Sequence, residues 1–300
     1  MIALLALLLP PQADFVSKAV KSLDQPSIGV TLLDVSSAKD VLTEKAYKEL
    51  ASSRKRSGVV VLYIKAKSPA ATAGLKQGDI ILGVDRDKVR SLDEFGKSLA
   101  KLKPSNSCDV FISRSFKPKR GAVVWKRKKV RVRPRPLRDI YLSQMLKEKD
   151  EVTGTERYRH SQLPKYVNER TALSPVFTTK SGRLVAARLR FQYTAADWLF
   201  ISTITVKADD VTIQLTPRDV ERDHSGGKIW EWCNVDLAGV NAGLLDKIAN
   251  ANSVTVRFTG SQYKKDFKVP MNDRLALREA AVTHKILLKP AKTSVPKPVK

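Results

Sequence analysis

The chain has 300 residues, of which 42% are apolar, and this is enough for two packed cores of ordinary domain size. Its 55 Lys and Arg residues outnumber 30 Asp and Glu residues, which gives a net charge of +25 and favours acidic partners wherever the basic residues cluster. The two cysteines and three histidines are scattered without the spacing of metal ligands. We therefore expect no metal, no cofactor and no disulfide, and two buried thiols at Cys108 and Cys233.

Residues 1–13 begin with an apolar run, Ile2 to Leu9, that is too short to cross a bilayer. Such a run is typical of a secretory signal peptide, here with cleavage after Ala13. The usual Lys or Arg before the run is missing, and Pro11 is a poor residue three positions before a cut. The alternative is a buried N-terminal helix. Elsewhere the sequence predicts no membrane-spanning segment.

Residues 27–64 predict a loop, a strand, a helix and a second strand. Gly29 would allow a close backbone approach just before a strand at 30–33. The helix is predicted over 39–51, because apolar residues recur there at every fourth position. Six branched or aromatic residues at 59–64 predict the second strand.

Residues 68–81 read Ser-Pro-Ala-Ala-Thr-Ala-Gly-Leu-Lys-Gln-Gly-Asp-Ile-Ile. A short helix from Pro69 to Ala73 would end at Gly74, because a helix C-terminus favours a residue that adopts positive φ. Gly78 and Asp79 then predict a tight turn into a buried strand that begins at Ile80.

Residues 91–114 predict a helix followed by a strand. Ser91 and Glu94 form a capping box, and Phe95 and Leu99 lie on the buried side of a helix that ends before Pro104. Gly96 is unusual there, since glycine inside a helix costs roughly 1 kcal/mol relative to alanine. It indicates either room for a ligand side chain or close packing against another backbone. Residues 108–114 predict the closing strand.

Taken together, residues from about Ser27 to Arg114 resemble a PDZ domain of the bacterial HtrA type. The resemblance implies a β-rich barrel with two helices that binds protein C-termini or extended peptides by strand addition. The amides of residues 28–30 would hold the terminal carboxylate, and an apolar pocket would take the last side chain. The implied peptide-binding residues are Ser27, Ile28, Gly29, Val30, Thr31, Leu32, Leu92, Gly96 and Leu99. Together with the apolar run at residues 2–9, the resemblance favours export to the periplasm or cell envelope of a bacterium.

The sequence departs from HtrA proteins in one respect. About a dozen residues precede Asp14, and no Gly-x-Ser-x-Gly elbow occurs, so we expect no serine protease domain, no catalytic residues and no enzyme. Lys18 and Lys21 are near the loop in sequence and could assist a carboxylate, but the sequence places neither.

Residues 114–138 are rich in Lys and Arg and contain no Asp or Glu. Residues 129–133 alternate as a strand with one wholly basic face, which would be the last hairpin of the PDZ unit. Such a face attracts acidic surfaces or polymers, and the alternative is a solvated strand and linker. The candidate polyanion-binding residues are Lys126, Arg127, Lys128, Lys129, Arg131 and Arg133.

The expected order is a PDZ-like domain at 14–133, a linker with a short helix at 134–173, a β-rich domain at 174–289 and a disordered tail at 290–300. In the third segment, strands are predicted at 184–193, 198–206, 211–215, 229–235, 254–258 and 263–269. Helices are predicted at 241–251 and 272–287, the second capped by Asn272. The fold class is multidomain: a PDZ-like α+β barrel, then a β-sandwich or α+β unit that loosely resembles domains of uncharacterised exported bacterial proteins.

Two features of the second domain leave alternatives open. Asp219, Asp223, His224 and Glu231 could support a hydrolase, although polar turns contain the same residue types. Trp230 and Trp232 point to one face of a strand, where they would meet a sugar or a partner, or pack in the core.

Overall fold

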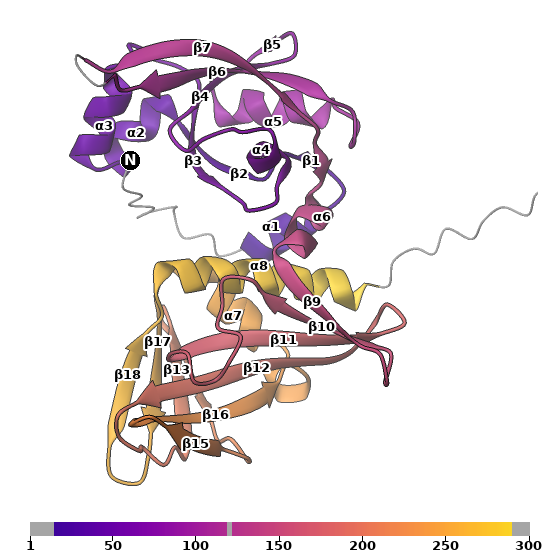
Figure 1. The fold of residues 1–300 in the computed structure, drawn as a ribbon, viewed down its shortest axis with the longest axis vertical. Helices are drawn as coiled ribbons and strands as arrows, with labels where there is room; N and C mark the ends of the chain where they lie inside the picture. The colour runs from indigo at the N-terminus through magenta and orange to yellow at the C-terminus, as the bar shows by residue number, and fades with distance from the viewer. Residues whose placement is uncertain (1–14, 119–121, 290–300) are drawn as a thin grey trace, which may run out of the picture. The chain divides into compact units, whose positions relative to one another are not determined.

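The computed structural model describes residues 15–118 and 122–289, and the chain forms two compact units (Figure 1). Among the described residues, the first unit is 22–118 and 122–144, and the second combines 145–289 with 15–21. The signal peptide predicted at 1–13 and the tail predicted at 290–300 lie outside the described residues. Within 15–118 and 122–289, no helix is both long and apolar enough to cross a membrane.

The first unit is built from short strands and helices around one sheet. Its strands are β1 (Pro26–Ser27), β2 (Val30–Asp34), β3 (Val59–Ile64), β4 (Ile80–Val84), β5 (Asp87–Lys88), β6 (Cys108–Phe116), β7 (Val124–Val132) and β8 (Arg135–Pro136). Its helices are α2 (Ala38–Val41), α3 (Glu44–Ala51), α4 (Pro69–Thr72), α5 (Leu92–Ala100) and α6 (Leu137–Ser143).

The main sheet of this unit has the order β2-β3-β4-β6-β7, with β5 beside β4, and β1 pairs separately with β8. Two apolar clusters lie on its two faces, because side chains alternate along each strand. Val59, Val61 and Ile81 pack with α5 residues in one cluster, whereas Val60 and Ile80 pack with α2 and α3 residues in the other. The sheet is therefore covered on both faces, and β2 forms one of its edges.

The sequence predicts one helix over 39–51, and this was wrong in detail. The chain forms α2, then leaves the helical conformation at Leu42, which has ψ 154°, and starts again at α3. Thr43 is the N-cap of α3, and its Oγ1 accepts a hydrogen bond from the Ala46 N–H at 3.3 Å. A threonine at this position favours a cap over a helix interior, and this divides the helix in two.

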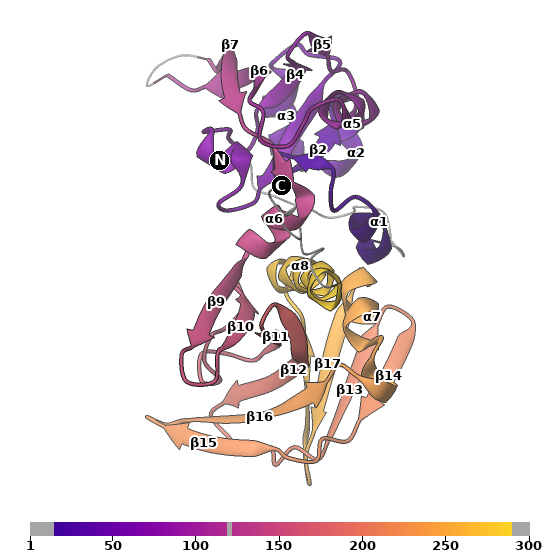
Figure 2. The same ribbon diagram turned by 90° about the vertical axis from the view of Figure 1, so that its right-hand side faces the viewer.

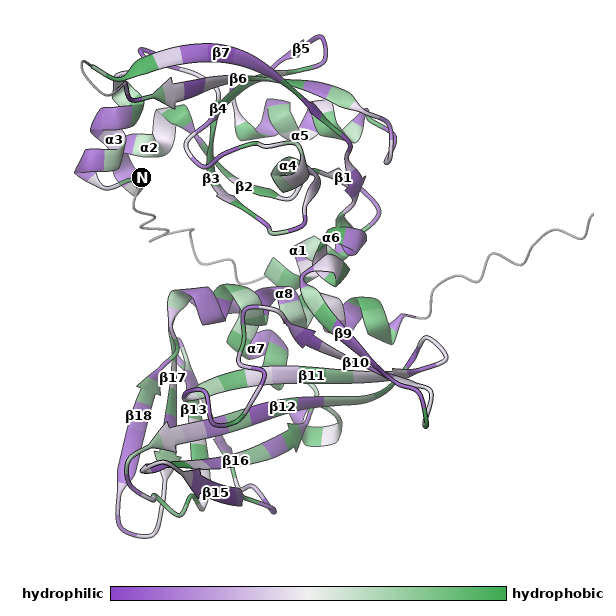
Figure 3. Ribbon diagram, in the orientation of Figure 1, coloured by the Kyte–Doolittle hydropathy of each residue, from purple (hydrophilic) through white to green (hydrophobic). Residues whose placement is uncertain are grey.

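The predicted turn at 68–81 is confirmed. Ser68 Oγ accepts from the Ala71 N–H at 3.2 Å and caps α4, and Gly74 ends that helix with φ +77°. Gly78, with φ +86°, turns the chain into β4. The predicted hairpin is also present, and β7 is largely hydrophilic (Figure 3) except where Val130 and Val132 pack on the core.

In its described residues, 15–21 and 145–289, the second unit contains two antiparallel sheets and three α-helices. One sheet has the order β15-β16-β12-β11-β10-β9, and the other has the order β14-β13-β17-β18. The strands are β9 (Met145–Asp150), β10 (Thr155–His160), β11 (Ala172–Lys180), β12 (Arg183–Ala195), β13 (Thr203–Ala208), β14 (Val211–Leu215), β15 (Glu221–Ser225), β16 (Lys228–Asp236), β17 (Val254–Thr259) and β18 (Lys264–Lys268). The helices are α1 (Phe15–Lys21), α7 (Leu244–Asn250) and α8 (Met271–Leu288).

In Figure 2 the two sheets of this unit lie at an angle to each other, with α8 at one end of them. Apolar residues of α8, among them Ala276, Leu277 and Ala280, are fully buried, as are Phe177 of β11 and Phe191 of β12. Residues 15–21, which the sequence assigned to the first domain, pack on this unit, where the Val16 N–H donates to Asn250 Oδ1 at 3.2 Å. Two sheets and buried helices make this a β-rich unit, as expected.

Several expectations for the second half of the chain were wrong. Residues 145–150 and 155–160, predicted to lie in the linker, form β9 and β10, and β11 and β15 were missed as well. The strands β9, β10 and β15 are mostly hydrophilic (Figure 3), so they lack the apolar alternation that identifies a strand. The strand predicted from Trp198 begins only at Thr203, and α8 begins at Met271 after Pro270, so Asn272 lies inside the helix and is not its cap.

Candidate peptide-binding groove

The loop at Ile28 and Gly29 is held by its two carbonyl groups. The Ile28 carbonyl accepts from the Ala70 N–H at 2.9 Å, and the Gly29 carbonyl accepts from the Lys65 N–H at 2.9 Å. Because a trans peptide unit places its C=O and N–H on opposite sides, the N–H groups of Gly29 and Val30 both point away from segment 65–70. Two of the three amides expected to converge on a carboxylate therefore share one side of the loop.

One of these amides already has a partner. The Gly29 N–H donates to Ser27 Oγ at 3.2 Å, so the Ser27 hydroxyl lies on the amide side of the loop. A hydroxyl that accepts one hydrogen bond can still donate its own proton. The loop thus offers the Val30 amide and the Ser27 hydroxyl as donors, with Gly29 holding the hydroxyl in place.

Glycine is required at position 29 by two constraints. Its φ is +76°, and a Cβ built there would lie 2.4 Å from Ser68 Cβ. Ile140 of α6 lies close to the same point, 3.4 Å away at Cγ2. The helix that the sequence placed in a linker therefore packs against the back of the loop, and this support was not foreseen.

The strand β2 has a free side. It is the end strand of its sheet, and within the described part of the first unit only β3 pairs with it. Val30 stands opposite Ile64, and the bond from Lys65 to Gly29 flanks this pair. In an antiparallel ladder such a pair is not hydrogen-bonded, so the N–H and C=O of Val30 point outward from the sheet. The backbone of an added strand can form hydrogen bonds with the N–H and C=O groups of Val30.

Helix α5 is fixed beside the far end of β2. Asp34 Oδ1 accepts from the Leu92 N–H at 2.7 Å, and Ser91 Oγ accepts from the Glu94 N–H at 3.3 Å. The predicted capping box is only half formed, because the Glu94 carboxylate accepts from the Arg90 N–H and not from Ser91. Asp34 thus joins the helix start to the strand.

The helix residues predicted for the pocket lie on one side of α5. Leu92, Gly96 and Leu99 follow the i, i+4, i+7 spacing of one helix face. Leu92 is 40% exposed and Leu99 is buried in the core cluster that also holds Ile28. A Cβ built at Gly96 would meet no atom within 4 Å, so close packing against another backbone does not explain this glycine.

The strand residues predicted for the pocket divide between two faces. Val30 and Leu32 are half-buried and pack against the same cluster as Ile28 and Leu99. Thr31 stands opposite Tyr63 and alternates with them. The structure thus brings Ile28, Val30, Leu32 and Leu99 together, with Leu92 and Gly96 at the exposed rim.

A buried ion pair supports the turn before β4. Asp79 is 1% exposed, and its carboxylate accepts hydrogen bonds from Arg114 Nε at 2.6 Å and Arg114 Nη2 at 2.7 Å. The hydrogen bond to Asp79 raises the pKa of Arg114 above its usual value. The same guanidinium donates to the Gly74 carbonyl at 2.9 Å. Arg114 therefore serves the fold and does not belong to a free basic surface.

The other basic residues of 114–138 are also partly engaged. Lys129 and Arg131 flank Asp109 at 3.3 Å each, and Arg133 Nε donates to the Ser105 carbonyl at 2.6 Å. Lys126 lies over the Phe116 ring at 5.6 Å. Arg127, Lys128 and Lys129 line a cleft of about 610 Å³, the basic cleft, on the side of the sheet that bears Leu82 and Phe111.

In the second unit, one of the acids considered for hydrolysis, Glu231, is part of the structural core. Glu231 is fully buried, and its carboxylate accepts from the N–H groups of Leu199, Phe200 and Ile201 and from Arg222 Nε. Through these four hydrogen bonds, Glu231 fixes the backbone of residues 199–201. No group of three or more metal-ligand side chains occurs in 15–118 and 122–289.

The cysteines are free and buried, as predicted. Burial raises the pKa of Cys108 to about 11 and that of Cys233 to about 12. Neither thiol therefore ionises at neutral pH, and both act as small apolar core residues.

Comparison with known proteins is informative for the first unit. The model of the PDZ domain family matches residues 26–123. A stretch of 51 residues is 44% identical to the periplasmic serine endoprotease DegP of Salmonella typhimurium (strain LT2), covering 17% of this chain and 11% of that protein. A stretch of 65 residues is 35% identical to the probable periplasmic serine endoprotease DegP-like of Chlamydia trachomatis serovar D, covering 22% and 13%.

Among solved structures, the HtrA3 PDZ domain bound to a phage-derived ligand (FGRWV) is similar, with 19% identity and a TM-score of 0.26. That similarity covers 37% of this chain and 86% of the other. The chain spans only 11% to 13% of the length of the two curated relatives named above. The family model identifies residues 26–123 as a PDZ domain, and the similarity to the DegP proteins is limited to short stretches of 51 and 65 residues.

Proposed function

We propose that this protein is a non-catalytic binding module that captures C-terminal or extended peptides by strand addition to β2. The observation that carries the proposal is the outward-pointing backbone of Val30 at the free side of β2. A peptide lying antiparallel to β2 would form hydrogen bonds with this backbone. Its terminal carboxylate would accept hydrogen bonds from the Val30 amide and the Ser27 hydroxyl.

The last side chain of the peptide would enter between β2 and α5. Val30 and Leu32 provide one apolar wall, Leu99 provides the base, and Leu92 provides the rim. Because Gly96 leaves the space beside it open, we expect the pocket to accept branched or large apolar residues. Specificity for apolar C-termini follows from this lining, since it offers no charged group to a polar side chain.

Export is part of the same proposal. The apolar run near the N-terminus supports it, as do the periplasmic relatives that share the PDZ segment. The natural partners would then be proteins of the bacterial periplasm or envelope with exposed C-termini. A fusion of residues 1–40 to a reporter that is active only after export would test this; reporter activity is expected, and a strictly cytoplasmic reporter would contradict it.

The test of peptide binding is a synthetic library of C-terminal peptides, varied at the last four positions and measured against the full chain. We expect binders that end in Val, Leu, Ile or Phe. Deleting the last residue of a binder should abolish its affinity, because the carboxylate would then carry a different side chain into the pocket. A library without any binder would overturn the proposal.

The basic cleft supports a second candidate function, the binding of an acidic polymer or surface. Seven basic and two acidic side chains line it, and one of the acids, Asp87, is paired with Lys101 at 2.8 Å. We expect heparin, used as a probe, to bind with an affinity that falls steeply with salt. Replacing Arg127, Lys128 and Lys129 by Gln should flatten that salt dependence, whereas the same change at the exposed Lys39, Lys45 and Lys76 should not. Binding that is indifferent to salt would exclude this function.

A further inference from the structure

Four arginines gather on one face of the six-stranded sheet of the second unit. Arg157 and Arg159 come from β10, and Arg188 and Arg190 come from β12. They line a cleft of about 220 Å³, the arginine cleft, together with Thr178, Trp232 and three other side chains, none of them acidic. The proposed peptide groove lies in the other unit and uses none of these residues.

The strand register brings these arginines together. Val176 of β11 stands opposite Arg159 on one side and opposite Arg188 on the other. Thr178 stands opposite Arg157 and Ala186 in the same way. Residues directly opposite on neighbouring strands point to the same face, so short side chains on β11 leave room for the long arginines on both sides. The cleft is therefore a consequence of the sheet pairing.

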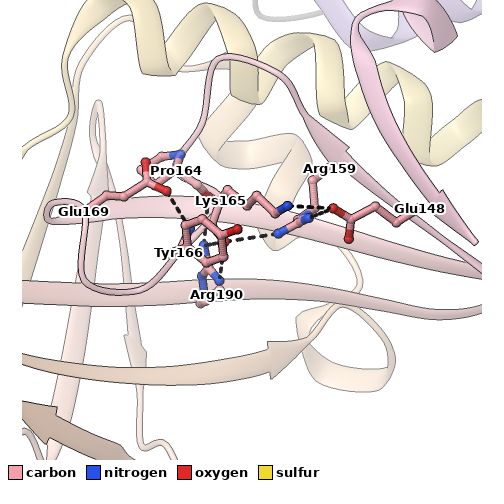
Figure 4. Close-up of polar contacts among 7 residues, drawn as sticks. All are labelled: Glu148, Arg159, Pro164, Lys165, Tyr166, Glu169 and Arg190. Atoms are coloured by element: carbon pink, nitrogen blue, oxygen red, sulfur yellow. Dashed lines mark hydrogen bonds and ion pairs between the residues drawn. The ribbon is translucent and has the colours of Figure 1, made fainter. Parts of the chain in front are cut away.

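Two of the arginines have carboxylate partners. Arg159 Nη2 lies 2.5 Å from Glu148 Oε1, and Arg188 Nε lies 3.0 Å from Asp236 Oδ1. Arg159 also donates to the Lys165 carbonyl, and Figure 4 shows Arg159 and Arg190 converging there. Lys165 shares Glu148 at 3.3 Å, so the acids nearby do not balance the charge of the cleft.

The other two arginines form no ion pair with a carboxylate among the described residues, and the carboxylates that act on their charges from a greater distance are Glu169 for Arg190 and Asp150 for Arg157. Arg190 donates only to the carbonyls of Pro164, at 2.9 Å, and Lys165, while its Nε is buried without a partner. Burial and the nearby Arg159 lower the pKa of Arg190 to about 10. Arg157 is exposed and forms no hydrogen bond or ion pair within the described part of the chain. The arginine cleft thus holds two guanidinium groups that no ion pair neutralises, and no acid is among the residues that line it.

We propose that the arginine cleft binds a doubly charged oxyanion of the phosphate class, carried as a phosphomonoester on a small molecule. A phosphomonoester carries a charge between about −1.5 and −2 at pH 7, which matches the two unpaired guanidinium groups. Guanidinium groups donate paired hydrogen bonds to phosphate oxygens in a fixed fork geometry. The half-buried Trp232 offers a flat apolar surface to the body of the ligand.

The size of the cleft supports a compact anionic group. Drug-sized ligands occupy pockets of about 300–1,000 Å³, and the arginine cleft is smaller than this range. A single carboxylate would leave one of the two unpaired charges without a counter-charge. The preferred ligand is therefore a dianion, and a monocarboxylate should bind more weakly.

A purely structural role for these arginines makes a different prediction. Arg190 and Gln192 donate to backbone carbonyls between Pro164 and Arg170 and hold that segment on the sheet. Arg157 and Arg188 make no such bond and are exposed. If the cluster only held the segment, Arg157 and Arg188 could be neutralised without any effect on anion binding.

The experiment compares glycerol phosphate, inorganic phosphate and acetate as probes of the full chain by isothermal titration calorimetry at pH 7.5 and constant ionic strength. Both phosphates should bind, and acetate should bind at least tenfold more weakly. Arg157→Gln should weaken phosphate binding at least tenfold, and Arg188→Gln should weaken it as well. Arg183→Gln on the same strand, exposed and outside the cleft, is the matched control and should have no effect.

The proposal is overturned if phosphate does not bind, if acetate binds as tightly, or if Arg183→Gln weakens binding as much as Arg157→Gln. That last result would indicate only a general attraction of anions to a basic chain. Because Arg190→Met removes bonds to the 164–165 segment and could disturb folding, the decision rests on the exposed Arg157 and Arg188.

Discussion

Replacing Gly96 by alanine should make the PDZ unit more stable and its groove less open. Gly96 lies in the middle of α5, is exposed and has a helical backbone, and a Cβ there would meet no atom within 4 Å. The substitution therefore adds no clash and removes the entropy cost of glycine. Alanine is favoured over glycine inside a helix by about 0.8–1.0 kcal/mol, and we expect the free energy of unfolding to rise by about that amount.

Hydrogen exchange measured by mass spectrometry on the full chain is a suitable assay, because it reports on each unit separately. A gain of about 1 kcal/mol slows exchange through unfolding about fivefold. We expect this slowing in peptides that cover β4 and β6 of the first unit and no change in peptides from β12. Unchanged or faster exchange in β4 and β6 would refute the placement of Gly96 in open space.

Larger residues at position 96 should then separate binding from stability. Gly96→Leu would place a side chain in the space between α5 and β2, and we expect peptide affinity to fall at least tenfold while the unit stays folded. Lys97→Leu, one residue along the helix, is the matched control, because Lys97 is exposed and forms an ion pair with Asp93 on the surface of the same helix. Equal loss of binding in both variants, or in neither, would contradict the groove proposed here.

Three further predictions concern stability. Gly29→Ala should destabilise the first unit by at least about 1–2 kcal/mol, because of its positive φ and the contact of 2.4 Å with Ser68 Cβ; unchanged exchange in β2 would contradict this. Arg114→Met should lower the free energy of unfolding of the first unit by about 3–5 kcal/mol, because Asp79 would remain buried without its arginine partner. An unchanged free energy of unfolding in a denaturant titration would contradict this. Burial lowers the pKa of His284, so the second unit should lose stability as pH falls below about 6.5, where the unfolded chain takes up the proton first. The limiting slope is about 1.4 kcal/mol per pH unit, and His284→Phe, which keeps the stacking on Phe177, should remove this part of the pH dependence measured between pH 7.5 and 5.5.

The first unit could be predicted well where short-range signals determine the structure. The string from Ser68 to Ile81 combines a capping serine, two glycines with positive φ and a buried strand, all of which act over a few residues. The contacts that support the loop could not be predicted in the same way. Asp79 and Arg114 are 35 residues apart, and Ile140 reaches Gly29 from a helix that the sequence placed in a linker.

The second unit shows the opposite case. The alternation along β12 places Leu189 and Phe191 in the core and Arg188 and Arg190 on the other face, as the sequence predicts. Four strands of this unit were missed. Three of them, β9, β10 and β15, are edge or near-edge strands with polar side chains on both faces, whereas β11 lies inside the sheet and is largely buried. Without β10 in the sheet, Arg157 and Arg159 could not be placed beside Arg188 and Arg190.

The central claim is that a free peptide carboxylate binds at the loop of residues 27–30, beside the free side of β2. The most direct test is to take one peptide from the library that binds the full chain and measure it twice, once with a free C-terminus and once amidated. We predict that amidation weakens binding at least tenfold, and that Ser27→Ala, which removes one donor, weakens only the free-acid peptide. Equal affinities for the two peptides would contradict the account, because the Val30 amide and the Ser27 hydroxyl would then have no role in recognition.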